Sequence, residues 1–126
     1  MTARILICDD EELIRFSLSE YFSLKGYQTV QAEDGWHCLD LLSKTRFDLV
    51  LLDLKMPRMD GLTALRKLRE KDHDVPVIVI TGNADIESAV LAMQYKAATF
   101  IQKPFDLAEL FARCQALINE YAAQRR

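Results

Sequence analysis

The chain has 126 residues, 50% of them hydrophobic, and its 16 basic and 19 acidic residues give a formal net charge of −3. A chain of this length forms one domain around a single core, and its balanced charge gives no basis for binding nucleic acid or an anionic membrane. No apolar run approaches the roughly 20 residues of a membrane span, and the N-terminus lacks the apolar core of a signal peptide, so we expect a cytoplasmic protein. The scattered cysteines Cys8, Cys38 and Cys114 indicate neither a disulfide framework nor a zinc site, and we expect them to be buried.

The first part of the chain alternates between strand and helix patterns. The apolar run 5–8 predicts a short strand that stops at Asp9 and Asp10, and the helical spacing that follows predicts a helix ending at Gly26. The more polar run 28–32 is typical of an edge strand. The Asp34-Gly35 turn then precedes a predicted helix over 36–44.

The stretch 48–61 is the most informative part of the chain. The apolar run 49–52 predicts a buried strand that ends abruptly at Asp53, and Pro57 marks the loop beyond it. Asp60 is the predicted N-cap of a third helix. Because open α/β sheets carry their chemistry at the carboxyl ends of the strands, Asp53 is the first candidate for a reactive group.

The second half of the chain repeats the alternation twice. The apolar run 77–80 predicts a strand ending at Thr81, and a helix over 85–95 follows it, with an apolar stripe at Ile86, Val90 and Met93. A short strand over 99–102 leads to Lys103, and the spacing of Asp106 and Glu109 predicts a capping box for the last helix. Five strands alternating with five helices predict an α/β fold, in which helices cover both faces of a parallel sheet.

This fold brings residues that are distant in sequence to one edge of the sheet, namely Asp9, Asp10, Asp53, Thr81 and Lys103. Carboxylates held so close repel one another unless a cation lies between them, and a hard divalent ion such as Mg²⁺ meets that need. A carboxylate beside Mg²⁺ and a lysine is suited to forming an acyl phosphate, with Asp53 as the nucleophile.

Taken together, these residues resemble the receiver domain of two-component response regulators. The resemblance rests on Asp9-Asp10, Asp53 in D-x-x-M-P-x-M-D-G, Thr81-Gly82 and Lys103-Pro104-Phe105, and it covers essentially the whole chain. It implies a flavodoxin-like, doubly wound (βα)5 fold whose five-stranded parallel sheet has the order 2-1-3-4-5. The receiver domain would span residues 1–122, and residues 123–126 would begin a linker or C-terminal tail.

The resemblance also implies a role for each matching residue. Asp53 would accept a phosphoryl group from a sensor histidine kinase, and Thr81 and Lys103 would bind the phosphoryl oxygens. Phe100 would change rotamer as the threonine moves, Gly82 would leave room for the phosphoryl group, and the Lys103–Pro104 bond would be cis. The Mg²⁺ ligands would be Asp10, Asp53 and the backbone carbonyl of Lys55, with Asp9 acting through water. Such a domain is a regulatory phospho-acceptor that catalyses only its own phosphotransfer and dephosphorylation.

One turn departs from the family pattern. Receiver domains usually carry Gly-Ala before the fifth strand, whereas this chain has Lys96-Ala97. If the turn needs a positive φ, lysine costs about 1 kcal/mol relative to glycine. The turn adjoins the fourth helix, fifth strand and fifth helix, the face by which the family signals and a candidate homodimer face.

Several functions remain open at this stage. We expect a C-terminal output domain outside this chain that controls transcription, as in enhancer-binding activators of the nitrogen-regulation type, without direct nucleic-acid binding by this domain. A stand-alone receiver, a phosphorelay protein and a phosphorylation-independent interaction module are the alternatives. A haloacid-dehalogenase phosphatase would need an aspartate where this chain has Lys55, and no glycine-rich nucleotide motif follows any strand.

Overall fold

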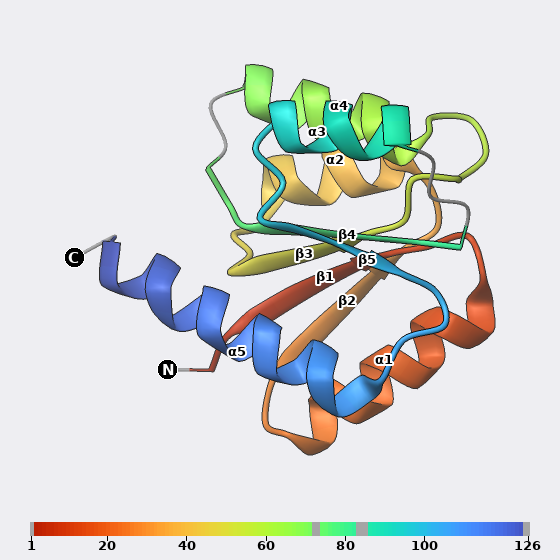
Figure 1. The fold of residues 1–126 in the computed structure, drawn as a ribbon. Helices are drawn as coiled ribbons and strands as arrows, with labels where there is room; N and C mark the ends of the chain where they lie inside the picture. Colours follow the sequence, from red (N-terminus) through yellow and green to blue (C-terminus); the bar gives the residue numbers. More distant parts are fainter. Residues whose placement is uncertain (1, 72–73, 83–85, 125–126) are drawn as a thin grey trace.

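The computed structural model describes residues 2–71, 74–82 and 86–124, which form an α/β fold (Figure 1). Its five parallel strands lie in the order β2-β1-β3-β4-β5, which confirms the predicted topology. Helices α1 and α5 cover one face of the sheet, and α2, α3 and α4 cover the other (Figure 1). The elements are β1 (Arg4–Cys8), α1 (Glu12–Leu24), β2 (Gln28–Ala32), α2 (Gly35–Lys44), β3 (Leu49–Leu52), α3 (Gly61–Glu70), β4 (Val77–Thr81), α4 (Ile86–Gln94), β5 (Thr99–Gln102) and α5 (Leu107–Gln124).

The central strands are apolar at consecutive positions because helices cover both faces of the sheet. Every residue of β3 and β4 is buried, whereas β2 keeps exposed positions as an edge strand, in agreement with its polar sequence. Alternate residues enter two separate cores, one under α2, α3 and α4 and one under α1 and α5. The three cysteines are free and buried, as predicted.

Side-chain caps begin three of the helices. Asp34 accepts a hydrogen bond from the His37 N–H at 2.8 Å, and the predicted cap Asp60 accepts one from the Thr63 N–H at 2.8 Å. The Asp106 carboxylate accepts from the Glu109 N–H at 2.9 Å, which confirms that residue as the predicted cap of α5. These caps satisfy N–H groups that a helix cannot pair internally.

The apolar stripe of α4 faces solvent rather than the sheet. Ile86, Val90 and Met93 are 84%, 50% and 48% exposed, whereas Ala92 is fully buried. Ala92 is thus the residue of α4 that is buried against the core, and the larger side chains of the predicted stripe lie outside. The predicted start of this helix at residue 85 lies outside the described residues.

Helices α1 and α4 end in the same hydrogen-bonded motif. After α1, the Gly26 N–H donates to Ser23 and the Tyr27 N–H to Phe22, with φ of 93° at Gly26. After α4, the N–H groups of Lys96 and Ala97 make the equivalent bonds to the carbonyls of Met93 and Ala92, with φ of 64° at Lys96. Both are Schellman motifs, in which the left-handed position favours glycine. The positive φ anticipated at Lys96 is therefore present.

The side chain of Arg69 holds the turn after α4 from the neighbouring helix α3. Its Nε donates to the Tyr95 carbonyl at 3.0 Å, its Nη2 to the Lys96 carbonyl at 3.0 Å and its Nη1 to the Val75 carbonyl at 2.8 Å. These bonds help to keep Lys96 in its unfavourable backbone conformation. Among the described residues, no helix is both long and apolar enough to cross a membrane.

Candidate functional site

Four strands deliver candidate residues to the carboxyl edge of the sheet. Asp9 follows β1, Asp53 follows β3, Thr81 ends β4 and Lys103 follows β5. The Asp53 N–H donates to the Cys8 carbonyl at 2.9 Å, and the Lys103 N–H donates to the Thr81 carbonyl at 2.9 Å. The hydrogen-bond pattern of the sheet thus continues into the site, and these side chains start from fixed backbone positions.

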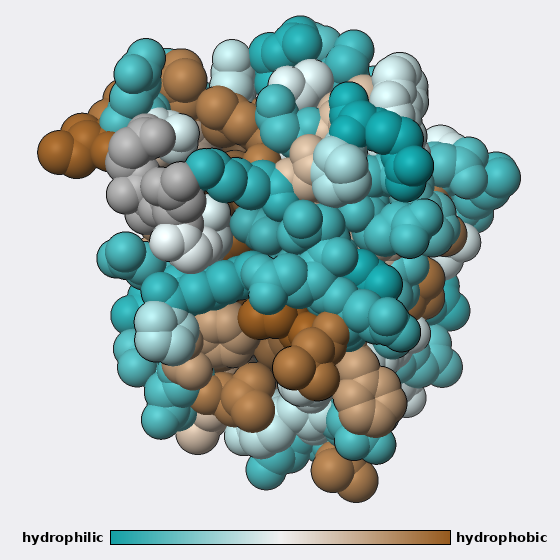
Figure 2. Space-filling view, turned by 90° about the vertical axis from the view of Figure 1, so that its right-hand side faces the viewer, coloured by the Kyte–Doolittle hydropathy of each residue, from teal (hydrophilic) through white to brown (hydrophobic). Residues whose placement is uncertain are grey.

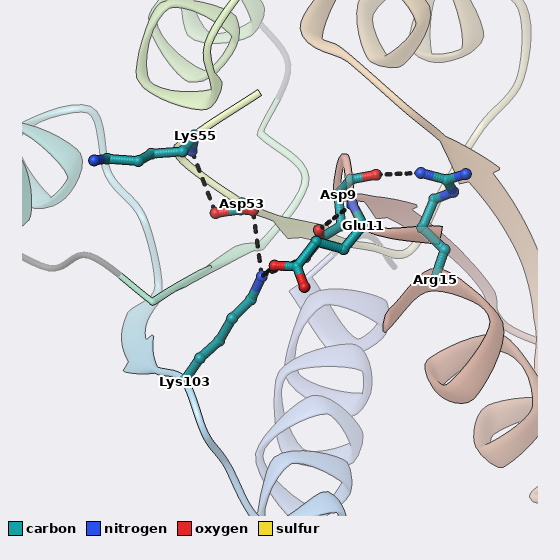
Figure 3. Close-up of polar contacts among 6 residues, drawn as sticks. All are labelled: Asp9, Glu11, Arg15, Asp53, Lys55 and Lys103. Carbon is teal, nitrogen blue, oxygen red and sulfur yellow. Dashed lines mark hydrogen bonds and ion pairs between the residues drawn. The ribbon is translucent and has the colours of Figure 1, made fainter. Parts of the chain in front are cut away.

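Lys103 connects three carboxylates of the site (Figure 3). Its Nζ lies 2.9 Å from Asp9 Oδ2, 3.1 Å from Glu11 Oε1 and 3.3 Å from Asp53 Oδ2. Burial disfavours the charged ammonium, but hydrogen bonds to Asp9 and Glu11 and the charges of Asp9 and Asp53 outweigh it and raise the pKa of Lys103. The site therefore holds a permanent positive charge beside Asp53.

The two innermost carboxylates are almost completely buried, with Asp9 3% and Asp53 4% exposed. Burial raises the pKa of Asp9 to about 6, against the opposing hydrogen bonds from the Glu11 N–H and Lys103. Burial also raises the pKa of Asp53, against the charge of Lys103 and a hydrogen bond from the Lys55 N–H. Both groups are less stable as anions here than in water, and a further cation would favour their ionised form.

The acidic cluster has the dimensions of a cation site. Asp9, Asp10, Glu11 and Asp53 each offer a carboxylate oxygen, and these atoms all lie within 4.8 Å of one another. Opposite oxygen ligands of Mg²⁺ are about 4.2 Å apart, since each bond is about 2.1 Å long. Asp10 and Glu11 are exposed, so the cluster opens to solvent on one side. These residues fit a divalent cation that keeps some of its bound water.

Thr81 and Phe100 lie on the same face of the sheet. Thr81 is paired with Gln102, and Phe100 is paired with Val79, two residues before Thr81. Thr81 is 1% exposed. Phe100 is half-buried and borders a cavity of about 260 Å³ along β5 and α5. The threonine and the aromatic side chain are therefore neighbours on the side of the sheet where Phe100 packs against the core under α2, α3 and α4.

Of the expectations for the residues around Lys103 and Asp53, one is confirmed, and the roles given to the Lys55 carbonyl and to Gly82 stay predictions. The Lys103–Pro104 bond is cis, as expected. The Lys55 N–H donates to Asp53 Oδ1 at 3.3 Å, while the Lys55 side chain points away from the cluster (Figure 3). A Cβ at Gly82 would lie 3.7 Å from Lys103 Cδ, an ordinary contact. Packing in this state does not require glycine there, and its role in making room stays a prediction.

Glu11 and Arg15 belong to the site but were not among the residues predicted from the sequence. Glu11 contacts Lys103, and the Arg15 Nη1 donates to the Asp9 carbonyl at 2.6 Å (Figure 3). Their spacing could have indicated this role. Glu11 and Arg15 are four residues apart at the start of α1, and residues four apart lie on the same side of a helix. Glu11 adds a fourth carboxylate to the cluster, and Arg15 holds the backbone of the loop that carries it.

The fold and the site together define an α/β domain with an acidic crevice and one central lysine at the carboxyl edge of its sheet. The family model of the response regulator receiver domain matches residues 5–115. This chain therefore belongs to the receiver domains of two-component response regulators.

Individual relatives agree with this assignment. Response regulator MprA from Mycobacterium sp. (strain KMS) is 41% identical over 119 residues, covering 94% of this chain and 52% of that protein. A CheY-like receiver domain protein from Methanospirillum hungatei JF-1 has a TM-score of 0.95 at 27% identity, covering 98% of this chain and 99% of that one. NtrX from Brucella abortus has a TM-score of 0.89 at 32% identity, covering 99% of this chain and 29% of that one. The chain thus spans about half the length of the curated relatives it matches.

Proposed function

We propose that this receiver domain is a phosphorylation switch, in which Asp53 accepts a phosphoryl group in a Mg²⁺-dependent reaction. The observation that carries this proposal is the contact of the Lys103 ammonium with Asp9 and Asp53 inside a cluster of four carboxylates. This arrangement combines a nucleophile, a fixed positive charge and a cation site within one crevice.

The proposed reaction transfers a phosphoryl group from a phosphohistidine of a sensor histidine kinase. A carboxylate oxygen of Asp53 attacks phosphorus, the bond between phosphorus and the imidazole nitrogen breaks, and its electron pair stays on that nitrogen. The product is an acyl phosphate, which water hydrolyses to free phosphate and the original carboxylate. Bound Mg²⁺ supplies charge neutralisation for the phosphoryl oxygens. Its ligands would be Asp10, Asp53 and the Lys55 carbonyl, with Asp9 acting through water.

Lys103 and Thr81 would detect the phosphoryl group. The ammonium that now bridges Asp9, Glu11 and Asp53 would pair with a phosphoryl oxygen, and the Thr81 hydroxyl would donate to another. Movement of Thr81 would free space for Phe100, which lies on the same face of the sheet and is only half-buried. Phosphorylation would then bias a two-state equilibrium at the face formed by α4, β5 and α5.

A protein phosphodonor must reach Asp53 from the solvent side of the crevice. Leu13 and Phe16, in the first turns of α1, are 75% and 54% exposed. Figure 2 shows hydrophobic side chains gathered below a hydrophilic band, on the side of the sheet that α1 and α5 cover. Exposed apolar side chains beside a polar site are typical of a protein-binding surface, and they support a kinase as the partner.

The domain organisation is also a proposal. Residues 1–122 would form the receiver domain and 123–126 the start of a linker to an output domain that controls transcription. The support is that the chain covers only 52% of MprA and 29% of NtrX, whose remaining lengths leave room for further domains. A homodimer through α4, β5 and α5 finds support in the exposed α4 residues Ile86, Val90 and Met93. Helix α5 supports it less, because Phe111 packs against rings of Tyr21, Phe22 and Tyr27 within the same chain.

The decisive experiment is an NMR titration of the chain and of Asp53→Ala with Mg²⁺ and then with beryllofluoride, a phosphoryl mimic. We expect Mg²⁺ to shift signals near Asp10, and beryllofluoride to shift those of Thr81, Phe100 and Lys103 in the parent only. If neither reagent changes the parent spectrum, the domain is a phosphorylation-independent interaction module of the same fold.

A further inference from the structure

Arg58, at the tip of the loop between β3 and α3, has an unusual backbone conformation. Its φ is 64°, and the N–H of Met59 donates to the carbonyl of Pro57 at 2.7 Å, which closes a three-residue turn around Arg58. A γ-turn whose central residue has a positive φ is rare, and it is strained when that residue carries a side chain. Such strain persists only where surrounding contacts hold it, and it gathers at functional sites.

Two sets of contacts fix this tip to the loop between β2 and α2. Arg58 donates from both Nε, at 2.8 Å, and Nη2 to Oδ2 of Asp34. The Asp34 side chain is 5% exposed and that of Arg58 is 60% exposed, so the guanidinium covers a buried carboxylate. The Gly35 N–H also donates to the Met59 carbonyl at 3.0 Å, and a Cβ on Gly35 would come within 2.6 Å of that oxygen. Glycine thus permits a close backbone contact next to the ion pair.

The other end of the same loop is fixed against Asp53. The Gly61 N–H donates to the Leu54 carbonyl at 2.9 Å, and a Cβ on Gly61 would lie 2.0 Å from the Asp53 carbonyl oxygen. The segment from Lys55 to Pro57 therefore runs between two anchored points. The anchor at the tip combines the Gly35–Met59 backbone bond with the ion pairs of Arg58, which are to the buried Asp34 and, at 3.5 Å, to the exposed Glu33.

We propose that Arg58 is a positioning residue for the cation site. By tying the loop tip to Asp34, it holds the Lys55 carbonyl toward the acidic cluster and so sets the affinity of the site for a divalent cation. This inference rests on the proposed function, in which Lys55 supplies a ligand. Asp34 is a firm base for the contact because it also caps α2 through the His37 N–H.

The test uses Arg58→Gly, because glycine adopts the positive φ without strain and keeps the turn while removing the tie to Asp34. Groups that orient metal ligands typically change metal affinity by about 10–100-fold when mutated. We expect the dissociation constant for Mg²⁺, from NMR titration of the chain, to rise about tenfold, while the thermal unfolding midpoint falls because the buried Asp34 loses its charge partner. Arg66→Ala, which removes an exposed ion pair with Glu70 on α3, should change neither quantity.

Two further variants separate positioning from a general structural effect. Asp34→Ser keeps a helix cap but removes the partner of Arg58, so it should weaken Mg²⁺ binding by the same factor as Arg58→Gly. The double variant should be no weaker than either single one, because the two residues act as a pair. Arg58→Lys, which keeps the charge without the forked geometry, should restore part of the affinity.

Two outcomes overturn the inference in distinguishable ways. A dissociation constant for Arg58→Gly within twofold of the parent, or effects that add in the double variant, would show that Arg58 does not position the site. A parent chain that does not bind Mg²⁺ at all would overturn the proposed function itself, and the inference with it.

Discussion

The ammonium of Lys103 lies 3.3 Å from the carboxylate of Asp53 before any phosphoryl group is present. The same ammonium is 2.9 Å from Asp9. Lys103 thus occupies the place of a cation among the carboxylates, and its charge opposes the binding of a second cation there. The residue proposed to detect phosphorylation would therefore also compete with a bound Mg²⁺ before phosphorylation.

Replacing Lys103 should therefore have opposite effects on two ligands. In Lys103→Ala, the Mg²⁺ affinity should increase roughly tenfold, because a positive charge close to the carboxylates is removed. Beryllofluoride binding should weaken, because one of its partners is lost. Calorimetric or NMR titrations measure both constants, and Lys44→Ala is the control because that exposed lysine pairs with Asp40 on α2. Weaker Mg²⁺ binding in Lys103→Ala would contradict this competition.

The buried carboxylate of Asp9 should make stability depend on pH. Its pKa of about 6 in the folded chain exceeds the value of about 3.9 for an exposed aspartate. The protonated group therefore stabilises the fold at low pH, and this contribution is lost as pH rises from about 4 through 6. At pH 7.5 without Mg²⁺, Asp9→Asn should increase the free energy of unfolding by about 2–3 kcal/mol.

Urea denaturation at two pH values checks this prediction. Near pH 4 the parent and Asp9→Asn should have almost the same free energy of unfolding. At pH 7.5, Mg²⁺ should stabilise the parent and so reduce the difference in free energy of unfolding between the two. If Asp9→Asn is more stable than the parent by the same amount at both pH values, the effect comes from packing or hydrogen bonding instead of ionisation.

Lys96 and Gly26 test the cost of a side chain in the same helix-ending motif. Lys96→Gly should raise the free energy of unfolding by about 1 kcal/mol, because glycine adopts a positive φ without steric cost. Gly26→Lys should lower it by a similar amount or more, since a Cβ there would meet no atom within 4 Å and the penalty is conformational. Thermal and chemical unfolding of both variants give the two values. A destabilised Lys96→Gly would mean that the lysine side chain makes a compensating contact.

The exposed face of α4 predicts self-association on activation. Sedimentation equilibrium with Mg²⁺ and beryllofluoride should show a dimer, and Val90→Gln should weaken it at least tenfold without changing the unfolding midpoint, since Val90 is 50% exposed. Leu24→Gln, at another exposed position on α1, is the control. A monomer under all conditions would leave α4 as a surface for a different partner.

The main features of the fold could be predicted from local sequence patterns. The apolar runs at 49–52 and 77–80 fixed the positions of β3 and β4, because strands covered on both faces need continuous apolar residues. The residues that follow these runs, Asp53 and Thr81, indicated the site, because the carboxyl ends of parallel strands lie at the same edge of the sheet. The caps Asp60 and Asp106 were recognisable because capping depends on contacts three residues away.

Other features depend on contacts between residues that are distant in sequence. The pairing of Arg58 with Asp34 joins two loops 24 residues apart, and the orientation of α4 buries Ala92 and exposes its predicted apolar stripe. Neither feature can be recognised from neighbouring residues in the sequence, because tertiary packing determines which residues come into contact. The sequence patterns therefore determined the alternation of strands and helices, the cysteine state and the candidate residues Asp9, Asp53, Thr81 and Lys103, whereas the strand order followed from the family resemblance. Only the tertiary structure decided how their charges are balanced, because ion pairing and burial depend on the distances between folded elements.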